Sequence, residues 1–158
     1  MINRKPEIHK LDLNALELLQ PLVDAFVHSH PTMPFRENLW SVFRGWLADS
    51  LENSDTLCLV ARVDDAAVGF ILGDVRQNVP LLLPDRIGYV SILVVDPTCR
   101  STGIGDALWQ AMKAWFLSRG VDHFELFTEY GNPVSRPFWA KRGFEVVMEK
   151  RRSRNYNL

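Results

Sequence analysis

The sequence predicts a single α/β domain, residues 1–158, in which a mixed sheet carries helices on its faces. Three observations predict this fold. Segments with the two-residue period of strands alternate with segments of helical period. Three strand segments follow one another before a strand–helix–strand unit, which combines antiparallel with parallel pairing. The 158 residues, 47% apolar and 23% charged, have the length and composition of one globular domain.

The composition excludes several classes of protein. With 18 Lys and Arg against 19 Asp and Glu, the chain lacks the basic excess of a general nucleic-acid binder. The longest apolar stretches have about half of the ~20 residues of a membrane span, and no apolar leader follows the basic N-terminus. Cys58 and Cys99 have neither zinc-site nor disulfide spacing. We therefore expect a cytoplasmic protein with no metal, no membrane partner and no nucleic acid.

The first elements are a short strand at 7–10 and a helix whose apolar stripe runs from Leu16 to Phe26. Asp12 or Asn14 is expected to cap this helix. Pro21 falls inside it and is expected to kink or interrupt it, because proline removes a backbone hydrogen bond.

Prolines mark a loop at 28–34, and a second helix is expected over 37–51. A hairpin follows, with strands at 56–63 and 68–72 joined by the turn Asp64–Asp65.

After a proline-containing loop at 78–85, the nearly continuous apolar run 87–95 predicts a central strand buried on both faces. The period then changes to 3.6 residues from Gly103, and Gly120 is expected to end that helix.

The last predicted elements are a strand at 121–128, a short helix from 133 or 134 to 142, and a final strand at 144–148. The basic run that follows, Lys150 to Arg154, is expected to be a solvated strand end.

The segment from Val94 to Gly105 joins the buried strand to the N-terminus of the amphipathic helix. A helix N-terminus presents unpaired N–H groups and a partial positive charge, so it attracts phosphate. Gly103 and Gly105 lack a Cβ and allow close approach to the backbone, and Arg100 adds a positive charge. The segment therefore predicts a pyrophosphate site.

Two other phosphate-binding patterns fit less well. A Walker loop requires Gly-Lys-Ser/Thr, which Gly105-Asp106-Ala107 does not provide. The dinucleotide fingerprint requires a third glycine where Leu108 stands, although Glu125 lies where a ribose-binding acid would. The two helices and the hairpin ahead of the loop also argue against a dinucleotide fold.

Two segments about 30 residues apart carry a family resemblance. Arg100-x-x-Gly103-x-Gly105, preceded by Leu93-x-Val95-x-Pro97, resembles the signature of the GCN5-related N-acetyltransferases, which bind acetyl-CoA. Asn132-x-x-Ser135-x-x-Phe138-Trp139-x-x-x-Gly143-Phe144 resembles a second segment of the same family. The resemblance spans about residues 8–148 and implies a mostly antiparallel mixed sheet, about four helices, and strands that splay at the coenzyme.

The resemblance also implies roles for individual residues. The strand backbone would pair with the pantetheine amides through Leu93, Val94 and Val95. The loop and helix start would cradle the pyrophosphate through Arg100, Ser101, Thr102, Gly103, Ile104 and Gly105. Asn132 and Ser135 would contact the pantetheine from the opposite wall, and we expect Trp139 to pack on the pantetheine arm. Asn132 is also a plausible helix cap, and the two roles are compatible.

The catalytic acid and base of the family do not carry over directly. Ser91-Ile92 stands where an acidic pair is common, and Trp139 stands where a Tyr is common. Glu129 and Tyr89 are the candidates for base and acid, and the other ionisable residues considered are Tyr130, His28 and His30.

The predicted activity is direct transfer of an acetyl group from acetyl-CoA to the primary amine of a small metabolite, aminoglycoside or peptide. The alternative is a non-catalytic acyl-CoA-binding or sensor domain. A homodimer is expected if a partner strand completes the sheet.

Overall fold

The computed structural model describes residues 5–153, which divide into two compact units with the boundary after Phe127. Residues 1–4 and 154–158, which include the start of the basic N-terminus and the end of the basic run, lie outside the described residues. The single domain over 1–158 stays a prediction.

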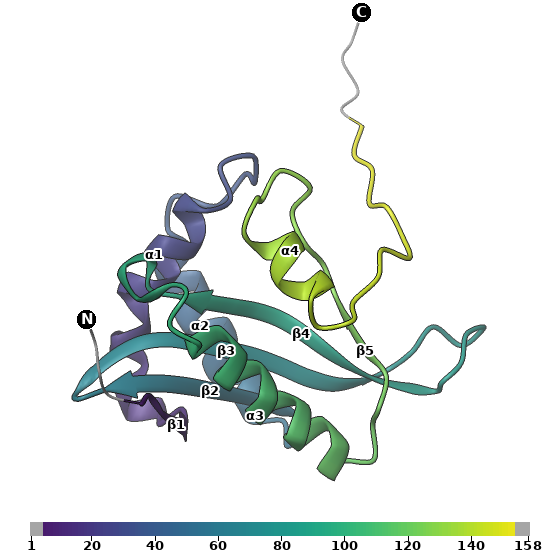
Figure 1. Ribbon diagram of the computed structural model, residues 1–158, viewed down its shortest axis with the longest axis horizontal. Helices are drawn as coiled ribbons and strands as arrows, with labels where there is room; N and C mark the ends of the chain where they lie inside the picture. The colour runs from purple at the N-terminus through teal and green to yellow at the C-terminus, as the bar shows by residue number, and fades with distance from the viewer. Residues whose placement is uncertain (1–4, 154–158) are drawn as a thin grey trace, which may run out of the picture. The chain divides into compact units, whose positions relative to one another are not determined.

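The first unit is built on one five-stranded sheet (Figure 1). Its strands follow the chain in the order β1 (Glu7–Lys10), β2 (Thr56–Val63), β3 (Ala66–Gln77), β4 (Arg86–Val95) and β5 (Phe124–Leu126). Neighbouring strands are antiparallel except β4 and β5, which are parallel. The predicted mixed, mostly antiparallel sheet is therefore confirmed.

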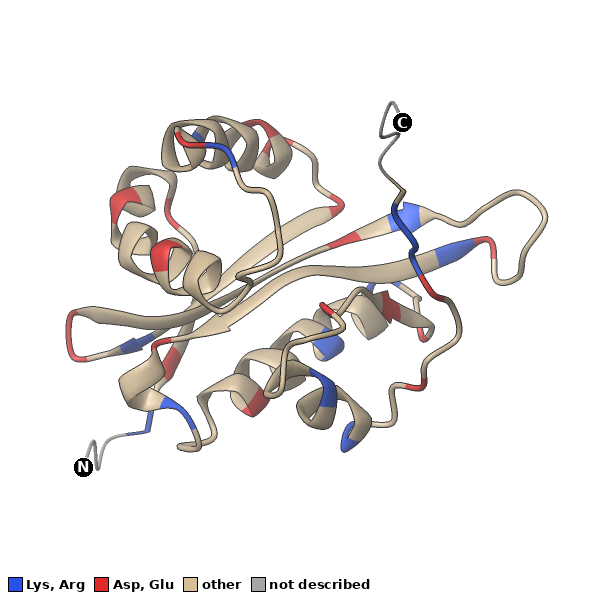
Figure 2. Ribbon diagram, turned by 90° about the horizontal axis from the view of Figure 1, so that it is seen from above, with Lys and Arg blue, Asp and Glu red and all other residues tan. Residues whose placement is uncertain are grey.

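Helices cover both faces of this sheet (Figures 1 and 2). One face carries the 3-10 helix η1 (Leu13–Leu19) with α1 (Gln20–His28) and α2 (Leu39–Leu51), and α3 (Ile104–Ser118) lies on the other. A short 3-10 helix, η2 (Pro97–Cys99), precedes α3. Figure 2 shows the charged residues on the outer sides of these helices and toward the ends of the strands.

The helical segment after β1 breaks close to Pro21, as expected. Residues before it form η1, and α1 begins at Gln20 with the proline in its first turn, where a missing N–H costs no helical hydrogen bond. Of the two expected capping residues, Asp12 is the one that caps, because its side chain accepts a 2.9 Å hydrogen bond from the Asn14 N–H.

Alternating residues of the strands form two apolar layers. Cys58 and Val60 of β2 and Phe70 of β3 join the core cluster that contains residues of η1, α1 and α2. On the opposite face of the sheet, glycines lie under α3 and have no side chain to hold it away. A Cβ at Gly73 would lie 2.9 Å from the Met112 sulfur, so the absence of a side chain allows α3 to pack closely on β3.

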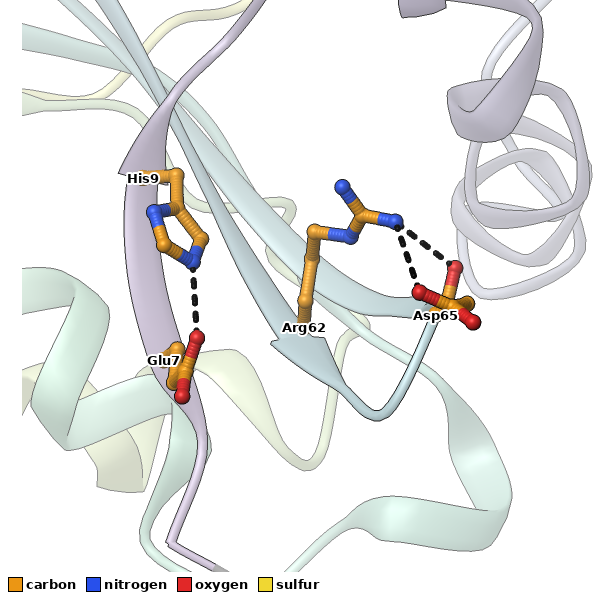
Figure 3. A network of polar contacts seen from close by, with 4 residues as sticks. All are labelled: Glu7, His9, Arg62 and Asp65. Carbon is orange, nitrogen blue, oxygen red and sulfur yellow. Dashed lines mark hydrogen bonds and ion pairs between the residues drawn. The ribbon is translucent and has the colours of Figure 1, made fainter.

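The β1 edge of the sheet carries polar contacts that belong to its turn and rim (Figure 3). Arg62 donates to the Asp65 carbonyl at 3.1 Å across the β2–β3 turn, and His9 Nε2 lies 3.1 Å from a Glu7 carboxylate oxygen on β1. The Arg62 contact stabilises the hairpin turn, the His9 contact lies within β1, and β1 is at the opposite edge of the sheet from β5.

The structure corrects four predictions. Strand β4 is not buried on both faces, because Tyr89 and residues 91–93 are only half-buried. The strand expected over 121–128 is reduced to β5, and the helix expected from 133 or 134 is α4 (Ser135–Ala140) in the second unit. No strand forms at 144–148, where Val146 and Val147 are 78% and 79% exposed. Strand propensity alone does not make a strand, since a strand requires a partner and a buried face.

Candidate functional site

The sheet opens between β4 and β5. The two strands pair only at Gly88–Phe124, Tyr89–Glu125 and Val90–Leu126. Beyond Val90, β4 runs on to Val95 and has no further ladder pair with β5 within residues 5–153. Leu93, Val94 and Val95 keep their partners in β3, so their other edge is available to an extended ligand with amide groups.

A β-bulge in β4 lies where the opening begins. Val90 pairs with Gly73 and Ile92 pairs with Leu72, which leaves Ser91 as the extra residue. The extra residue shifts the alternation of side chains, so Tyr89 and Ile92 lie on the same face of the sheet although they are three residues apart. No pattern in the sequence predicts this bulge.

The loop after β4 is fixed by its own polar side chains. The Asp96 carboxylate accepts hydrogen bonds from the Thr98 N–H at 2.8 Å and from the Thr98 hydroxyl at 2.6 Å. These bonds, with a smaller contribution from the Arg100 charge, lower the pKa of Asp96. The Thr102 hydroxyl donates to the Cys99 carbonyl at 2.5 Å. The shape of the loop is therefore set without a ligand.

Helix α3 begins at the end of this loop with its N-terminal N–H groups uncapped by a side chain. Gly103 has φ +86° and no side-chain cap bond, and the Ala107 N–H donates to its carbonyl at 2.9 Å. The N–H groups of Ile104 and Gly105 precede that bond and have no helical acceptor. A Cβ on Gly103 would meet nothing within 4 Å, so the space beside the helix end is open.

The charges around this helix end have opposite signs. Arg100, Ser101 and Thr102 are exposed on the loop, where the Arg100 guanidinium adds to the positive end of the helix. Asp106 in the first turn favours the helix itself and opposes a bound anion. The open backbone, the positive φ and the arginine fit a diphosphate group.

The second unit contains α4 and the other predicted coenzyme contacts. Asn132 is buried, and its Oδ1 accepts hydrogen bonds from the N–H groups of Val134 and Ser135, both at 3.0 Å. It therefore caps α4, as one of its two expected roles requires. Trp139 is also buried and packs edge-on against Phe138 and Phe144, each with a centroid distance of 5.0 Å. The pantetheine contacts of Asn132, Ser135 and Trp139 stay predictions.

Tyr89 lies among charged residues on the face of the sheet that carries α1 and α2. It pairs with Asp74 on one side and Glu125 on the other. Burial, the largest influence, raises the pKa of the Tyr89 phenol, and the charges of Asp74 and Glu125 raise it further. The charge of Arg76 lowers it, but the net effect is a raised pKa. The phenol is therefore neutral at physiological pH and is able to donate a proton.

The other catalytic candidates have mainly structural contacts. Glu129 is half-buried and its carbonyl accepts from the Asn132 N–H at 3.1 Å. Tyr130 is 86% exposed, with the Arg136 guanidinium 4.9 Å from its ring centre. His28 and His30 each place Nδ1 2.8 Å from a carbonyl of α1, which fixes the end of that helix.

Within the described part of the chain, no group of three or more His, Cys, Asp or Glu side chains has the arrangement of a metal site. No described helix is both long and apolar enough to cross a membrane.

The fold and this site define an α/β protein in which an opened strand edge is followed by a helix whose N-terminus has no side-chain cap. The chain belongs to the acetyltransferase (GNAT) family, whose pattern matches residues 16–144. It is 33% identical over 95 residues to an L-2,4-diaminobutyric acid acetyltransferase of Nocardia farcinica. That match covers 58% of this chain and 47% of the relative, so it spans about half of the relative's length.

Solved structures of similar fold cover nearly the whole chain. A predicted acetyltransferase from Clostridium acetobutylicum, solved with acetyl-CoA, has a TM-score of 0.79 at 16% identity, covering 95% of this chain and 96% of its own. A GCN5-related N-acetyltransferase from Ralstonia eutropha has 0.75 at 25% identity, with coverage of 94% and 98%. An aminoglycoside 6'-N-acetyltransferase from Acinetobacter haemolyticus has 0.77 at 15% identity, with coverage of 95% and 98%.

Proposed function

We propose that this protein is an acetyl-CoA-dependent N-acetyltransferase that moves the acetyl group directly to a primary amine. The observation that carries the proposal is the open edge of β4 at Leu93–Val95, joined by the loop 96–102 to the uncapped N-terminus of α3 at Gly103; these three segments together are called the track. An elongated ligand with amide groups at one end and a diphosphate at the other fits this track. Membership of the acetyltransferase family supports the same ligand.

Each part of the track has a role toward acetyl-CoA. The backbone of Leu93, Val94 and Val95 pairs with the pantetheine amides as an added strand would. The loop and helix end hold the diphosphate with backbone N–H groups and one guanidinium, through Arg100, Ser101, Thr102, Gly103, Ile104 and Gly105. The hydroxyl proton of Thr102 is already donated to Cys99, so the Thr102 N–H is the group left for phosphate. The family resemblance adds Asn132, Ser135 and Trp139 as further proposed pantetheine contacts.

In the reaction, the amine nitrogen attacks the thioester carbonyl, the C–N bond forms and the C–S bond breaks. A lysine-like ammonium has a pKa of about 10.4, so its proton must leave before attack. We assign that proton to Glu129, directly or through water, and assign protonation of the departing thiolate to Tyr89. Holding amine and thioester together supplies much of the remaining acceleration.

Direct transfer agrees with the state of the cysteines. Burial raises the pKa of the Cys58 thiol to about 12, so almost none of it is the nucleophilic thiolate at neutral pH. Cys99 is buried in the loop at the phosphate end of the track. Neither thiol is suited to carry the acetyl group.

The acceptor is a small amine, as it is for the relatives named after diaminobutyric acid and aminoglycosides. We also assign the activity to the cytoplasm, which supplies acetyl-CoA and keeps free thiols such as Cys58 and Cys99 reduced.

A homodimer is part of the proposal. The exposed apolar segment 146–148 has the composition of a strand and is free to pair with a second copy. A monomeric mass in solution at micromolar concentration would contradict the dimer without affecting the transferase.

The second candidate is a non-catalytic acyl-CoA sensor. Ser91-Ile92 and Trp139 favour it, because they occupy places where acidic and tyrosine side chains are common in the family. Binding of acetyl-CoA does not separate the two candidates. The test is release of free coenzyme A thiol from acetyl-CoA across a panel of primary amines. Amine-dependent release supports the transferase, and binding of acetyl-CoA without release for any amine supports the sensor.

A further inference from the structure

An apolar cavity of about 230 Å³ lies between the helices α1 and α2 and the sheet in the first unit. Nine residues line it, from α1, the loop before α2, α2 itself, β3 and β4, and every one has an apolar side chain. The lining includes Val23, Val42, Phe43, Trp46, Phe70 and Ile92.

The cavity has a buried floor and an open mouth. Phe70 of β3 is fully buried, and Val23 and Phe43 are nearly so. Val42 and Trp46 on α2 are 42% and 47% exposed although both line the cavity. A ligand therefore has access from solvent beside α2, and its inner end would contact apolar side chains.

The size of the cavity limits what fits inside it. A dry cavity of about 150 Å³ lined by aliphatic and aromatic side chains accepts benzene. Sites for drug-sized molecules have roughly 300–1,000 Å³. The cavity therefore matches one phenyl ring or one branched alkyl group with a short linker, and it is too small for a whole oligosaccharide or peptide.

The cavity reaches the strand that we assign to acetyl-CoA. Ile92 lines it, directly follows the bulge at Ser91 and directly precedes Leu93. Ile92 and Val94 lie on the α1–α2 face of β4, as their pairing with Leu72 and Phe70 shows. A molecule that places an amine at the open part of β4 from this face has the cavity beside it.

We infer that this cavity binds the apolar group of the acceptor, so the preferred acceptors are primary amines that bear one aryl or branched alkyl group. The inference rests on the proposed transferase function. The lining has no carboxylate to hold a second ammonium group, and burying a charge there unpaired would be unfavourable. The acidic side chains on the same face of the sheet, Asp74 and Glu125, lie beside Tyr89 and are not part of the lining.

The test compares four amines in the thiol-release assay with the full chain: 2-phenylethylamine, isoamylamine, ethanolamine and 1,3-diaminopropane. We expect kcat/KM for the two apolar amines to exceed that for the two polar amines by about tenfold or more. The variant Val42→Trp fills the mouth and is expected to reduce this preference by about tenfold, mainly through KM. Trp46→Ala is a second variant, which removes a wall of the mouth and is expected to reduce the preference severalfold. The matched control is Leu117→Trp, at an exposed apolar position of α3, which is expected to leave the preference unchanged.

The outcomes separate this inference from the proposed function. Turnover of all four amines without preference, or a preference that both cavity variants leave intact, overturns the inference and leaves the transferase standing. If acetyl-CoA binds but no amine is acetylated, the transferase is contradicted, and calorimetry with 2-phenylethylamine then decides whether the cavity binds it. A dimer that Val42→Trp converts to a monomer, without any amine preference, indicates that a second copy covers the cavity and also overturns the inference.

Discussion

The guanidinium carbon of Arg76 lies 3.8 Å from the centre of the Tyr89 ring. The same guanidinium donates two hydrogen bonds to Asp74, at 2.6 and 2.5 Å, so it is held in place over the ring. A cation in this position is attracted by the face of the aromatic ring. The contact orients Tyr89 at the base of the opening between β4 and β5 and restricts its rotation.

Replacement of Tyr89 by Phe tests its role as proton donor. The variant keeps the ring and its contact with Arg76 but has no hydroxyl. We expect kcat to fall by about 100-fold, as for loss of a general acid, with the KM for acetyl-CoA nearly unchanged. Because the pKa of Tyr89 is raised above its usual value of 10, the wild type should show no loss of activity from phenol ionisation below that pH. The control is Tyr130→Phe at an exposed ring, and equal rates for all three proteins would exclude Tyr89 as the acid.

Replacement of Gly103 by Val tests the diphosphate site. The position has φ +86° and open space around it, so the valine strains the backbone and extends into the space where the ligand is proposed to bind. We expect the acetyl-CoA Kd, measured by calorimetry, to rise at least tenfold.

Gly120→Val is a matched control at the other end of α3. Gly120 has φ +74°, and a Cβ there would also meet nothing within 4 Å. Both variants should therefore lose a similar amount of stability, about 1–2 kcal/mol, from strain of the left-handed backbone. Only the Gly103 variant should lose affinity for acetyl-CoA. Equal affinity in both variants would remove the helix N-terminus from the site.

The sequence was sufficient for the parts of the fold that depend on local chemistry. Pro21 interrupts its helix, Asp12 caps, and Gly120 follows the end of α3, because each acts on its own few residues. The sequence was insufficient for features that depend on how the strands pair. The bulge at Ser91 depends on the register of β3 against β4, and the length of β5 depends on how far it stays beside β4.

The same distinction applies to the candidate site. The Arg100–Gly105 segment was predicted because its glycines and arginine are contiguous in the sequence. The cavity was not predicted, because Phe26, Trp46 and Ile92 come from separate elements and each one alone reads as an ordinary core residue. The segment 144–148 resembled a strand in composition, yet its side chains have no sheet to cover them.

The packing of α3 on the sheet predicts a large effect at Gly88. A Cβ there would lie 2.8 Å from two atoms of the Phe116 ring, and Phe116 is fully buried. We expect Gly88→Ala to lower the free energy of unfolding in urea by about 1–3 kcal/mol, the range for overpacking a core. Gly45→Ala is the control, in α2 with nothing within 4 Å, and should raise stability by up to about 1 kcal/mol. A neutral Gly88 variant would mean that α3 does not pack closely here.

Replacement of Cys58 by Ala tests whether the acetyl group is transferred directly or through a covalent acetyl-enzyme. We expect Cys58→Ala to retain wild-type kcat, with about 1 kcal/mol lower stability from the lost packing of a fully buried side chain. With a pKa of about 12, roughly one thiol in a thousand is ionised at pH 9, so native Cys58 should resist iodoacetamide that modifies it readily after unfolding. Because the folded-state pKa is raised, the native state should lose stability as the pH rises above about 9. Loss of activity in the alanine variant, together with a trapped acetyl-thioester, would contradict direct transfer.

Asn132 has an observed role as the cap of α4 and a proposed role toward pantetheine, and one pair of variants separates them. Asn132→Asp retains the oxygen that accepts from the Val134 and Ser135 N–H groups but replaces the amide NH₂ with a second oxygen. Its stability should stay close to wild type, whereas Asn132→Ala should lose about 1 kcal/mol with the cap. If the amide also donates to pantetheine, both variants should weaken acetyl-CoA binding, and the Asp variant should do so without a change in Tm. Wild-type affinity in the Asp variant would restrict Asn132 to capping and would assign that wall of the coenzyme site to other residues.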